Sequence, residues 1–259
     1  MKDQGKFGEA VDAYKKSILI RPNYAHAYYN MGIAYHEHGE LNQAIKAFNK
    51  SISLKPNHAQ ACYNLGNTLQ DLGRLEEAEE SLRQAILWQP DFPEAYHNLS
   101  FTLLNSGRLK EGLDEYEWRW KAVPFLEKRQ FDVAEWSGEP VAGKTVLICH
   151  EQGLGDGLQF VRYGALLAEA GARVVFECPS SLVPLFAKIS WLNTVVPLGN
   201  ILPSFDLHVA LMSLPDKFGT TLETVPAEVP YLPLPKPQVD FEKFTIGVAW
   251  RGSKTNRKG

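Results

Sequence analysis

The segment 150–163 holds the densest group of residues that could do chemistry. Its glycines, Gly153, Gly155 and Gly157, permit a tight turn and a close approach of a ligand to the backbone. Asp156 lies near the start of the helix expected after this turn, where a carboxylate accepts backbone N–H bonds and can also take a proton from a substrate hydroxyl. A plain N-cap is the structural alternative for this aspartate.

A dinucleotide-binding fingerprint fits this turn only in part. Gly153 and Gly155 match the first two glycines of G-x-G-x-x-G, and Glu177 lies where an acid that holds a ribose is expected. Leu158 replaces the third glycine, and Asp156 would repel a pyrophosphate from the helix N-terminus. An NAD-type oxidoreductase is therefore the weaker alternative.

The elements that must position this turn alternate between strand and helix. Short apolar runs predict strands at 145–150, 173–178, 194–198 and 206–211, and helices at 156–170 and 181–189. This alternation is typical of a Rossmann-like parallel sheet, in which ligands bind beyond the carboxyl ends of the strands. A further apolar run at 244–250 predicts the first strand of a new unit.

The first half of the chain has a different pattern, with a period of 34 residues. The recurring residues are Pro22, Pro56, Pro90 and Pro124, and Gly5, Gly39, Gly73 and Gly107. Each period predicts two helices, the first ended by a glycine and the second by a proline. The pattern resembles the tetratricopeptide repeat and implies an α-solenoid, a fold that mostly binds other molecules.

These patterns predict an α-solenoid followed by a Rossmann-like α/β domain. The expected boundaries are 1–126 for the repeats (a partial repeat, then 25–58, 59–92 and 93–126), 127–143 for a linker, 144–238 for the sheet domain and 239–259 for a mostly missing second domain. The partial repeat leaves the helix predicted at 7–20 without its partner. We therefore expect the chain to be truncated at both ends.

Three asparagines occupy the same position in successive first helices. Asn30, Asn64 and Asn98 are expected on the concave face of the solenoid, where each amide can both donate and accept a hydrogen bond. This row could clamp an extended peptide, and it looks like the asparagine ladder of protein O-GlcNAc transferases. Local hydrogen bonding is the alternative role.

A second resemblance covers roughly residues 116–252. EQGLGDGLQFVRY, together with W-x-G, FDLHVALMSLP, FGTT and IGVAW, is similar to glycosyltransferase family 9, the heptosyltransferase-like enzymes, and above all to their tetratricopeptide-fused relatives. The resemblance implies the acceptor-side, N-terminal half of a GT-B fold. It also implies metal-independent transfer of a sugar from a nucleotide-sugar to a hydroxyl acceptor.

The resemblance also assigns roles by position. Asp156 is the expected general base on the acceptor. The residues expected to bind substrate are Glu151, Gln152, Gly153, Gly155, Gln159 and Arg162. A structural ion pair is the alternative for Arg162. Arg251 and Lys254 are expected near the donor phosphates, with a solvated tail as the alternative.

Composition limits the classes of partner and cofactor that we expect. The 259 residues include 27 Lys and Arg against 30 Asp and Glu, a net charge of −3 that does not favour nucleic acid. Cys62, Cys149 and Cys178 form no Cys-x-x-Cys motif, so we expect reduced thiols, a cytoplasmic location and neither a metal site nor a cofactor. No apolar run is long enough to predict a membrane span.

The sequence thus predicts a glycosyltransferase-like protein, catalytically incomplete as this chain stands, whose solenoid groove recruits the acceptor or a partner protein. The expected acceptor is a glycan, a lipid-linked sugar or a protein. The alternative is a non-catalytic tetratricopeptide scaffold for peptides or proteins, with a relic Rossmann-like domain.

Overall fold

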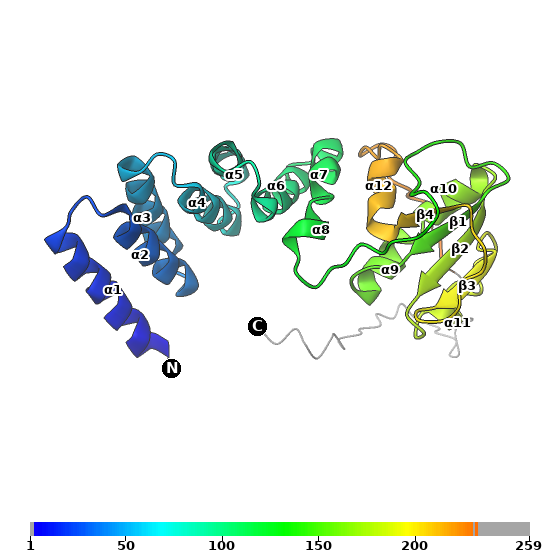
Figure 1. Cartoon of the computed structure of the whole chain (residues 1–259), viewed down its shortest axis with the longest axis horizontal. Helices are drawn as coiled ribbons and strands as arrows, with labels where there is room; N and C mark the ends of the chain where they lie inside the picture. The colour runs from blue at the N-terminus through cyan, green and yellow to red at the C-terminus, as the bar shows by residue number, and fades with distance from the viewer. Residues whose placement is uncertain (1–2, 230, 233–259) are drawn as a thin grey trace, which may run out of the picture.

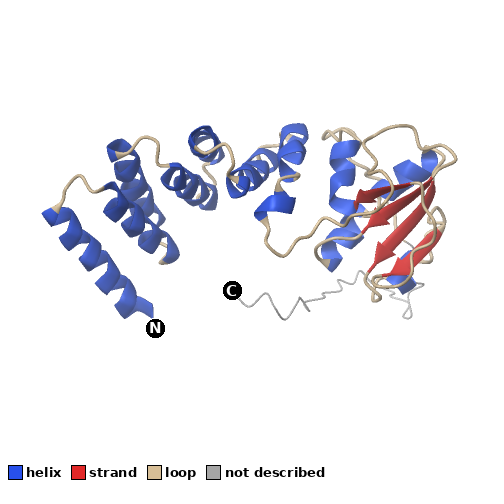
Figure 2. Cartoon of the chain, in the orientation of Figure 1, coloured by secondary structure: helices blue, strands red, loops and turns tan. Residues whose placement is uncertain are grey.

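The computed structural model describes residues 3–229 and 231–232. The strand predicted at 244–250, the unit predicted at 239–259, Arg251 and Lys254 lie outside the described residues. The chain forms a curved row of helices that leads into a unit built on a small sheet (Figures 1 and 2). Within the described part, no helix is both long and apolar enough to cross a membrane.

The row consists of helices packed in sequential pairs. Its members are α1 (Asp3–Ile20), α2 (Ala25–Glu37), α3 (Leu41–Leu54), α4 (Ala59–Asp71), α5 (Leu75–Trp88), α6 (Pro93–Asn105), α7 (Leu109–Tyr116) and α8 (Arg119–Ala122). Figure 1 shows α3, α5 and α7 along the outer side of the curve and α2, α4 and α6 toward its inner side. The two-helix period predicted from the sequence is confirmed.

Small residues allow the close packing within each pair. A Cβ atom on Gly32 would lie 2.6 Å from Cε1 of Phe48, so only glycine fits at this crossing of α2 and α3. The glycine after each first helix serves a different purpose, because Gly39, Gly73 and Gly107 all have positive φ. They end the helices in the left-handed conformation that the sequence predicts.

The third repeat departs from the other two in its second helix. The helix ends at Tyr116, and the chain turns through residues 117–118 before the short α8. This turn directs Glu117 and Arg119 toward the sheet unit. The end of the solenoid is thus reshaped by its contact with the next part of the chain.

The second part contains a parallel sheet, as predicted. Its strands are β1 (Thr145–Cys149), β2 (Arg173–Cys178), β3 (Thr194–Pro197) and β4 (Leu207–Ala210), in the order β3-β2-β1-β4. The connecting helices are α9 (Leu154–Phe160), α10 (Tyr163–Glu169) and α11 (Val183–Phe186), and the 3-10 helix η1 (Leu211–Ser213) and α12 (Leu214–Lys217) follow β4.

Two predicted helices are shorter or broken in the structure. The one expected at 156–170 divides into α9 and α10, because the chain turns at Val161, which is fully buried in the core, and at Arg162. The one expected at 181–189 is only α11. The chain turns directly after α11, which lets Ile189 and Trp191 pack onto the core.

The two faces of the sheet are covered differently. Helices α9, α10 and α11 pack on the face that presents Ile148, Val174 and Phe176. In the described chain the opposite face is covered by irregular segments, which contribute Phe131 and Phe205 among others. The Rossmann and GT-B assignments go beyond this small sheet and stay predictions.

Part of the segment predicted as a linker belongs to the sheet unit. Glu135 forms a parallel bridge with His208 of β4, and the backbone N–H of Trp136 donates to the His208 carbonyl at 2.7 Å. Trp136 is buried beside Phe218 in the core of the unit. In contrast, Trp118 stacks on Tyr96 of the solenoid.

Candidate functional site

The glycine-rich turn joins the carboxyl end of β1 to α9. The backbone N–H of Gly153 donates to Oδ2 of Asp156 at 2.9 Å, which closes the first turn of the helix. Asp156 is only partly buried. The structure therefore gives Asp156 a capping contact and leaves its predicted role as a base untested.

The three glycines of the turn do different things. A Cβ on Gly155 would have no atom within 4 Å, whereas one on Gly157 would lie 2.8 Å from Nε2 of His150. Gly157 thus permits close packing of α9 on the end of β1, and Gly155 leaves the turn open to solvent. The positive φ of the turn falls on Gln152, at 61°, and on none of these glycines.

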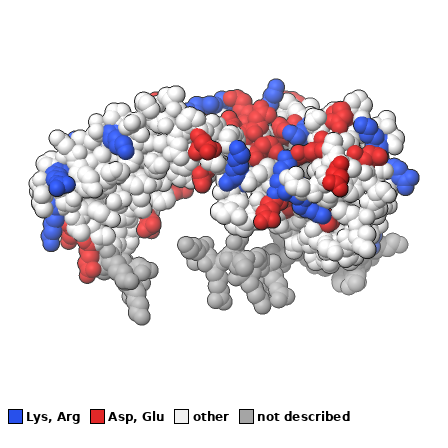
Figure 3. Space-filling model, in the orientation of Figure 1, with Lys and Arg blue, Asp and Glu red and all other residues white. Residues whose placement is uncertain are grey.

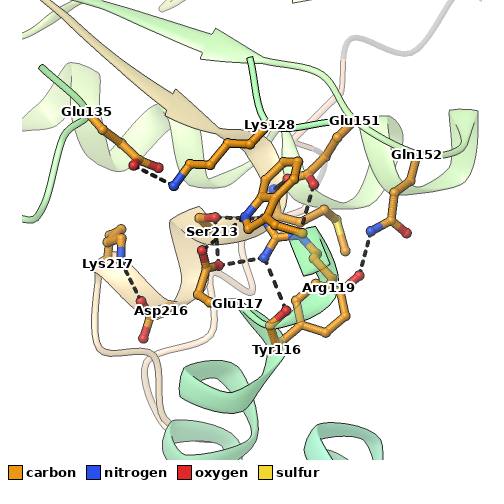
Figure 4. Close-up of polar contacts among 12 residues, drawn as sticks. Tyr116, Glu117, Arg119, Lys128, Glu135, Glu151, Gln152, Ser213, Asp216 and Lys217 are labelled. Atoms are coloured by element: carbon orange, nitrogen blue, oxygen red, sulfur yellow. Dashed lines mark hydrogen bonds and ion pairs between the residues drawn. The ribbon is translucent and has the colours of Figure 1, made fainter. Parts of the chain in front are cut away.

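A buried ion-pair network lies directly behind the turn (Figure 4). Arg119 is fully buried and donates to both carboxylate oxygens of Glu151, at 2.9 and 3.0 Å. It also donates to Glu117 at 2.6 Å and to the hydroxyl of Ser213 at 2.7 Å. The backbone N–H of Met212 donates to Glu151 at 2.8 Å.

This network defines the role that the geometry gives Glu151. Both of its oxygens are engaged, so the side chain connects the end of the solenoid with β1 and with the segment after β4. Its predicted role in substrate binding stays a prediction. Burial favours the neutral form of Glu117, but the charge and hydrogen bonds of Arg119 outweigh it and lower the pKa of Glu117. Glu117 is therefore ionised at neutral pH.

Two other predicted site residues, Arg162 and Gln159, have different surroundings. Arg162 donates to the carbonyl of Pro226 at 2.9 Å, and its guanidinium lies 3.9 Å from the ring centroid of Tyr231. It borders a cavity of about 520 Å³ between α10 and this C-terminal segment. Gln159 is exposed on α9. The structure does not bring Arg162 to Asp156.

A second cavity, of about 310 Å³, lies at the ends of β1 and β4. From β1 the chain continues to β2 and β3 on one side of the sheet and then places β4 on the other side of β1. Parallel sheets commonly bind ligands at such a point, where the strand order changes direction. Its lining includes Trp120, Lys128, Glu135, His150 and His208. The lining also includes Glu151, which the sequence reasoning named. That reasoning missed Lys128 and Glu135, because 127–143 shows no periodic pattern. Lys128 and Glu135 pair with each other at 2.7 Å.

The cysteines are buried and unreactive in this arrangement. Burial raises the pKa of Cys149 to about 12 and those of Cys62 and Cys178 to about 11. A thiol with so high a pKa is a poor nucleophile at neutral pH.

The asparagine row has tyrosine partners that the sequence reasoning missed. Nδ2 of Asn64 donates to the hydroxyl of Tyr29 at 3.2 Å, and Nδ2 of Asn98 donates to that of Tyr63 at 3.1 Å. Each bond joins first helices of neighbouring repeats, and Asn30 is exposed at the start of the row. The 34-residue step between the two tyrosines was the available signal.

Charge is distributed unevenly over the molecule. On the face drawn in Figure 3, charged side chains gather over the middle of the molecule and the sheet unit, and fewer lie over α2–α4. The solenoid's ion pairs include Arg74 with Glu77 and Arg108 with Glu79 and Glu111, all on the surface.

Comparison with known proteins supports the repeats. A family model described as TPR repeat matches residues 2–39, and one described as tetratricopeptide repeat matches residues 37–100. The N-terminal part of the chain therefore carries tetratricopeptide repeats. Both matches end before the glycine-rich turn, so the resemblance to glycosyltransferase family 9 stays a prediction.

Solved structures with a similar chain path include other repeat proteins. A crystal structure of MamA is 27% identical over 48% of this chain and 72% of that chain, with a TM-score of 0.44. MamA from Desulfovibrio magneticus RS-1 is 26% identical over 47% and 68%, with a TM-score of 0.44. YrrB, titled a TPR protein with an unusual peptide-binding site, is 24% identical over 48% and 63%, with a TM-score of 0.42. A search of curated proteins found no match.

Proposed function

We propose that the solenoid is a scaffold that binds an extended peptide segment of a partner protein along α2, α4 and α6. The tetratricopeptide repeats support this class of function, because such solenoids mostly act by binding. The observation that carries the proposal is the pair of amides, Asn64 and Asn98, each held by a tyrosine of the preceding repeat.

The tyrosine contacts decide which part of each amide faces a ligand. Nδ2 of Asn98 also donates to Oδ1 of Asn67 at 2.7 Å, so both of its N–H bonds are used, whereas Nδ2 of Asn64 keeps one. In each amide the carbonyl oxygen Oδ1 is the group that can accept a backbone N–H from the peptide. The tyrosine also fixes the amide before binding, which reduces the entropy lost in the complex. An extended segment is the natural ligand, since its backbone N–H groups are not used within it.

The test uses 12-residue peptides that are selected from a random display library by their binding to the full chain. Asn98→Ala should weaken binding about three- to tenfold, the loss expected for a hydrogen bond. Tyr63→Phe should weaken it less, because the amide remains and is still held by Oδ1 of Asn67 at 2.7 Å. Asn49→Ala is the matched control, since Asn49 is exposed on the outer helix α3. Unchanged affinity for Asn98→Ala would refute the proposal.

We propose, as a second function, that the complete protein transfers a sugar from a nucleotide-sugar to a hydroxyl, with Asp156 as the base. Its support is the position of Asp156, partly exposed in the turn after β1, together with the resemblance of that turn to glycosyltransferase family 9. The comparisons support the scaffold more directly than this activity.

Asp156→Asn separates the base from the cap. The amide oxygen of asparagine still accepts the Gly153 N–H, so stability should hold, but asparagine cannot take a proton. With UDP-, GDP- and ADP-linked sugars as probes, transfer should be lost in the variant while its melting temperature stays unchanged. If the Asp156→Asn variant still transfers sugar, Asp156 is not the base.

A further inference from the structure

A carboxamide held by a tyrosine hydroxyl occurs three times in the part of the chain that the structure describes. The pairs are Tyr29 with Asn64 at 3.2 Å, Tyr63 with Asn98 at 3.1 Å, and Tyr116 with Gln152 at 2.7 Å. The partners are 35, 35 and 36 residues apart. The first two pairs lie within the solenoid, and the third joins α7 to the glycine-rich turn (Figure 4).

The third pair replaces the tyrosine–asparagine pair that the next repeat would form. His97 occupies the position that Tyr29 and Tyr63 occupy in the two preceding repeats, so the 34-residue register supplies no hydroxyl there. Tyr116 supplies one instead, from the end of the following helix. The sheet unit supplies the amide, Gln152, that a further repeat would otherwise provide.

Aromatic contacts connect this pair with the solenoid row. The ring centroid of Tyr116 lies 5.6 Å from that of His97 and 5.9 Å from that of Phe101, both on α6. Asn98 follows His97 directly on the same helix. Tyr116 is itself buried, so it supports His97, Phe101 and Gln152 from beneath, and Phe101 is the exposed ring between Asn98 and Gln152.

The backbone of Gln152 points to a role beyond packing. It is the one non-glycine residue in the described chain with a positive φ, a conformation that side chains other than glycine adopt rarely. Such strained residues persist where their surroundings hold them, and they gather at functional sites. Gln152 is held on one side by Tyr116 and on the other by its neighbour Glu151, which Arg119 fixes.

We infer that Gln152 is the last amide of the peptide-binding row, so that a bound segment runs from the inner face of the solenoid onto the glycine-rich turn. The inference rests on the proposed peptide-binding function and extends its surface into the sheet unit. The partner is an extended polypeptide segment. The amides from Asn64 to Gln152 recognise its backbone.

The chemistry of this surface also restricts the side chains of the partner. Between Asn98 and Gln152 it consists of amides and aromatic rings. Burial, with the nearby charge of Arg119, lowers the pKa of His97, so its imidazole is neutral at neutral pH. The segment that lies here therefore carries uncharged or aromatic side chains.

The affinity test uses the full chain and 16-residue peptides selected on it from a random display library. Gln152→Gly removes the amide and suits the positive φ, so the turn keeps its shape. We expect it to weaken binding about three- to tenfold, as Asn98→Ala does. Gln43→Ala is the control, because Gln43 is an exposed glutamine on the outer helix α3 and its loss should leave affinity unchanged.

The outcomes separate the inference from the function on which it rests. Loss of affinity in both Asn98→Ala and Gln152→Gly supports the extended surface. Loss in Asn98→Ala alone overturns the inference and leaves the solenoid groove in place. No loss in either variant overturns both proposals, and melting temperatures confirm that each variant is folded.

A second measurement locates the peptide directly. A benzophenone side chain placed at Gly155 has room, since nothing lies within 4 Å of its Cβ position. We expect it to crosslink one end of the 16-residue peptide, and crosslinking should vanish when that end is shortened by four residues. Crosslinking that does not depend on either end of the peptide would contradict the inference.

Discussion

The solenoid and its junction with the sheet unit use arginine in opposite ways. Arg108 donates to Glu79 and Glu111 on the surface, and its side chain is 40% exposed. Arg119 donates to Glu117 and Glu151 and is 0% exposed. The partners are chemically the same, so the two sites differ in burial and in what they connect.

The comparison shows how each region obtains its stability. The partners of Arg108 lie 3 and 29 residues away, on its own helix and on the preceding repeat. Those of Arg119 include Glu151 and Ser213, which are 32 and 94 residues away. Repeats are stabilised by neighbours, whereas the junction depends on segments that meet only when the whole unit folds.

The largest effect is expected from Arg119→Met. The substitution leaves the carboxylates of Glu117 and Glu151 buried without their cation, which should lower the free energy of unfolding by about 3–5 kcal/mol. Urea denaturation followed by circular dichroism measures the loss. Arg119→Met combined with Glu151→Met should recover part of it, because fewer buried charges are then unpaired. A loss of less than about 1 kcal/mol would show that the junction network is not stabilising.

A smaller contrast is expected between two glycines of the turn. Gly157→Ala places a methyl group 2.8 Å from Nε2 of His150 and should cost about 1–3 kcal/mol through overpacking. Gly155→Ala meets no atom and should instead stabilise α9 slightly, by about 0.5 kcal/mol or more. Both values come from urea denaturation. Equal effects at the two positions would contradict the packing of His150 against α9.

Protonation should affect the solenoid through His58. Burial, with the charges of Lys55 and His26, lowers its pKa to about 4 from 6.5. The unfolded chain then binds this proton between pH 6.5 and 4 while the folded chain does not, so stability falls as pH falls through that window. Melting temperatures should decline less steeply with pH in His58→Gln. Parallel declines in the two proteins would exclude His58 as a cause.

The smallest effect is expected from Arg108→Ala. Exposed ion pairs are screened by solvent and salt, so the urea midpoint should barely move despite the contacts with Glu79 and Glu111. The same denaturation experiment, run beside Arg119→Met, provides the comparison. Similar losses in both variants would mean that burial does not distinguish the two arginines.

The elements with a repeating or strongly apolar pattern were predictable from the sequence. The 34-residue register located α2 to α6, and apolar runs located β1 to β4, because local spacing encodes these elements. The 34-residue register also placed Asn64 and Asn98 at equivalent positions on neighbouring inner helices. The glycine-rich turn was correctly expected between a strand and a helix.

The contacts between distant segments were not predictable. Nothing in the local sequence near Arg119 indicates Ser213, and nothing near Gln152 indicates Tyr116, because no periodic pattern relates segments from different folding units. The break between α9 and α10 was missed for the same reason. Arg162 leaves the helix to contact Pro226, a residue far along the chain.

The central claim is that amides on the inner helices bind the backbone of an extended peptide. A crystal structure of the chain with a selected peptide tests it most directly. The account predicts that the peptide lies along α2, α4 and α6, with its backbone N–H groups within hydrogen-bonding distance of Oδ1 of Asn64 and Asn98. A peptide bound on the outer helices, or with neither asparagine in contact, would contradict it.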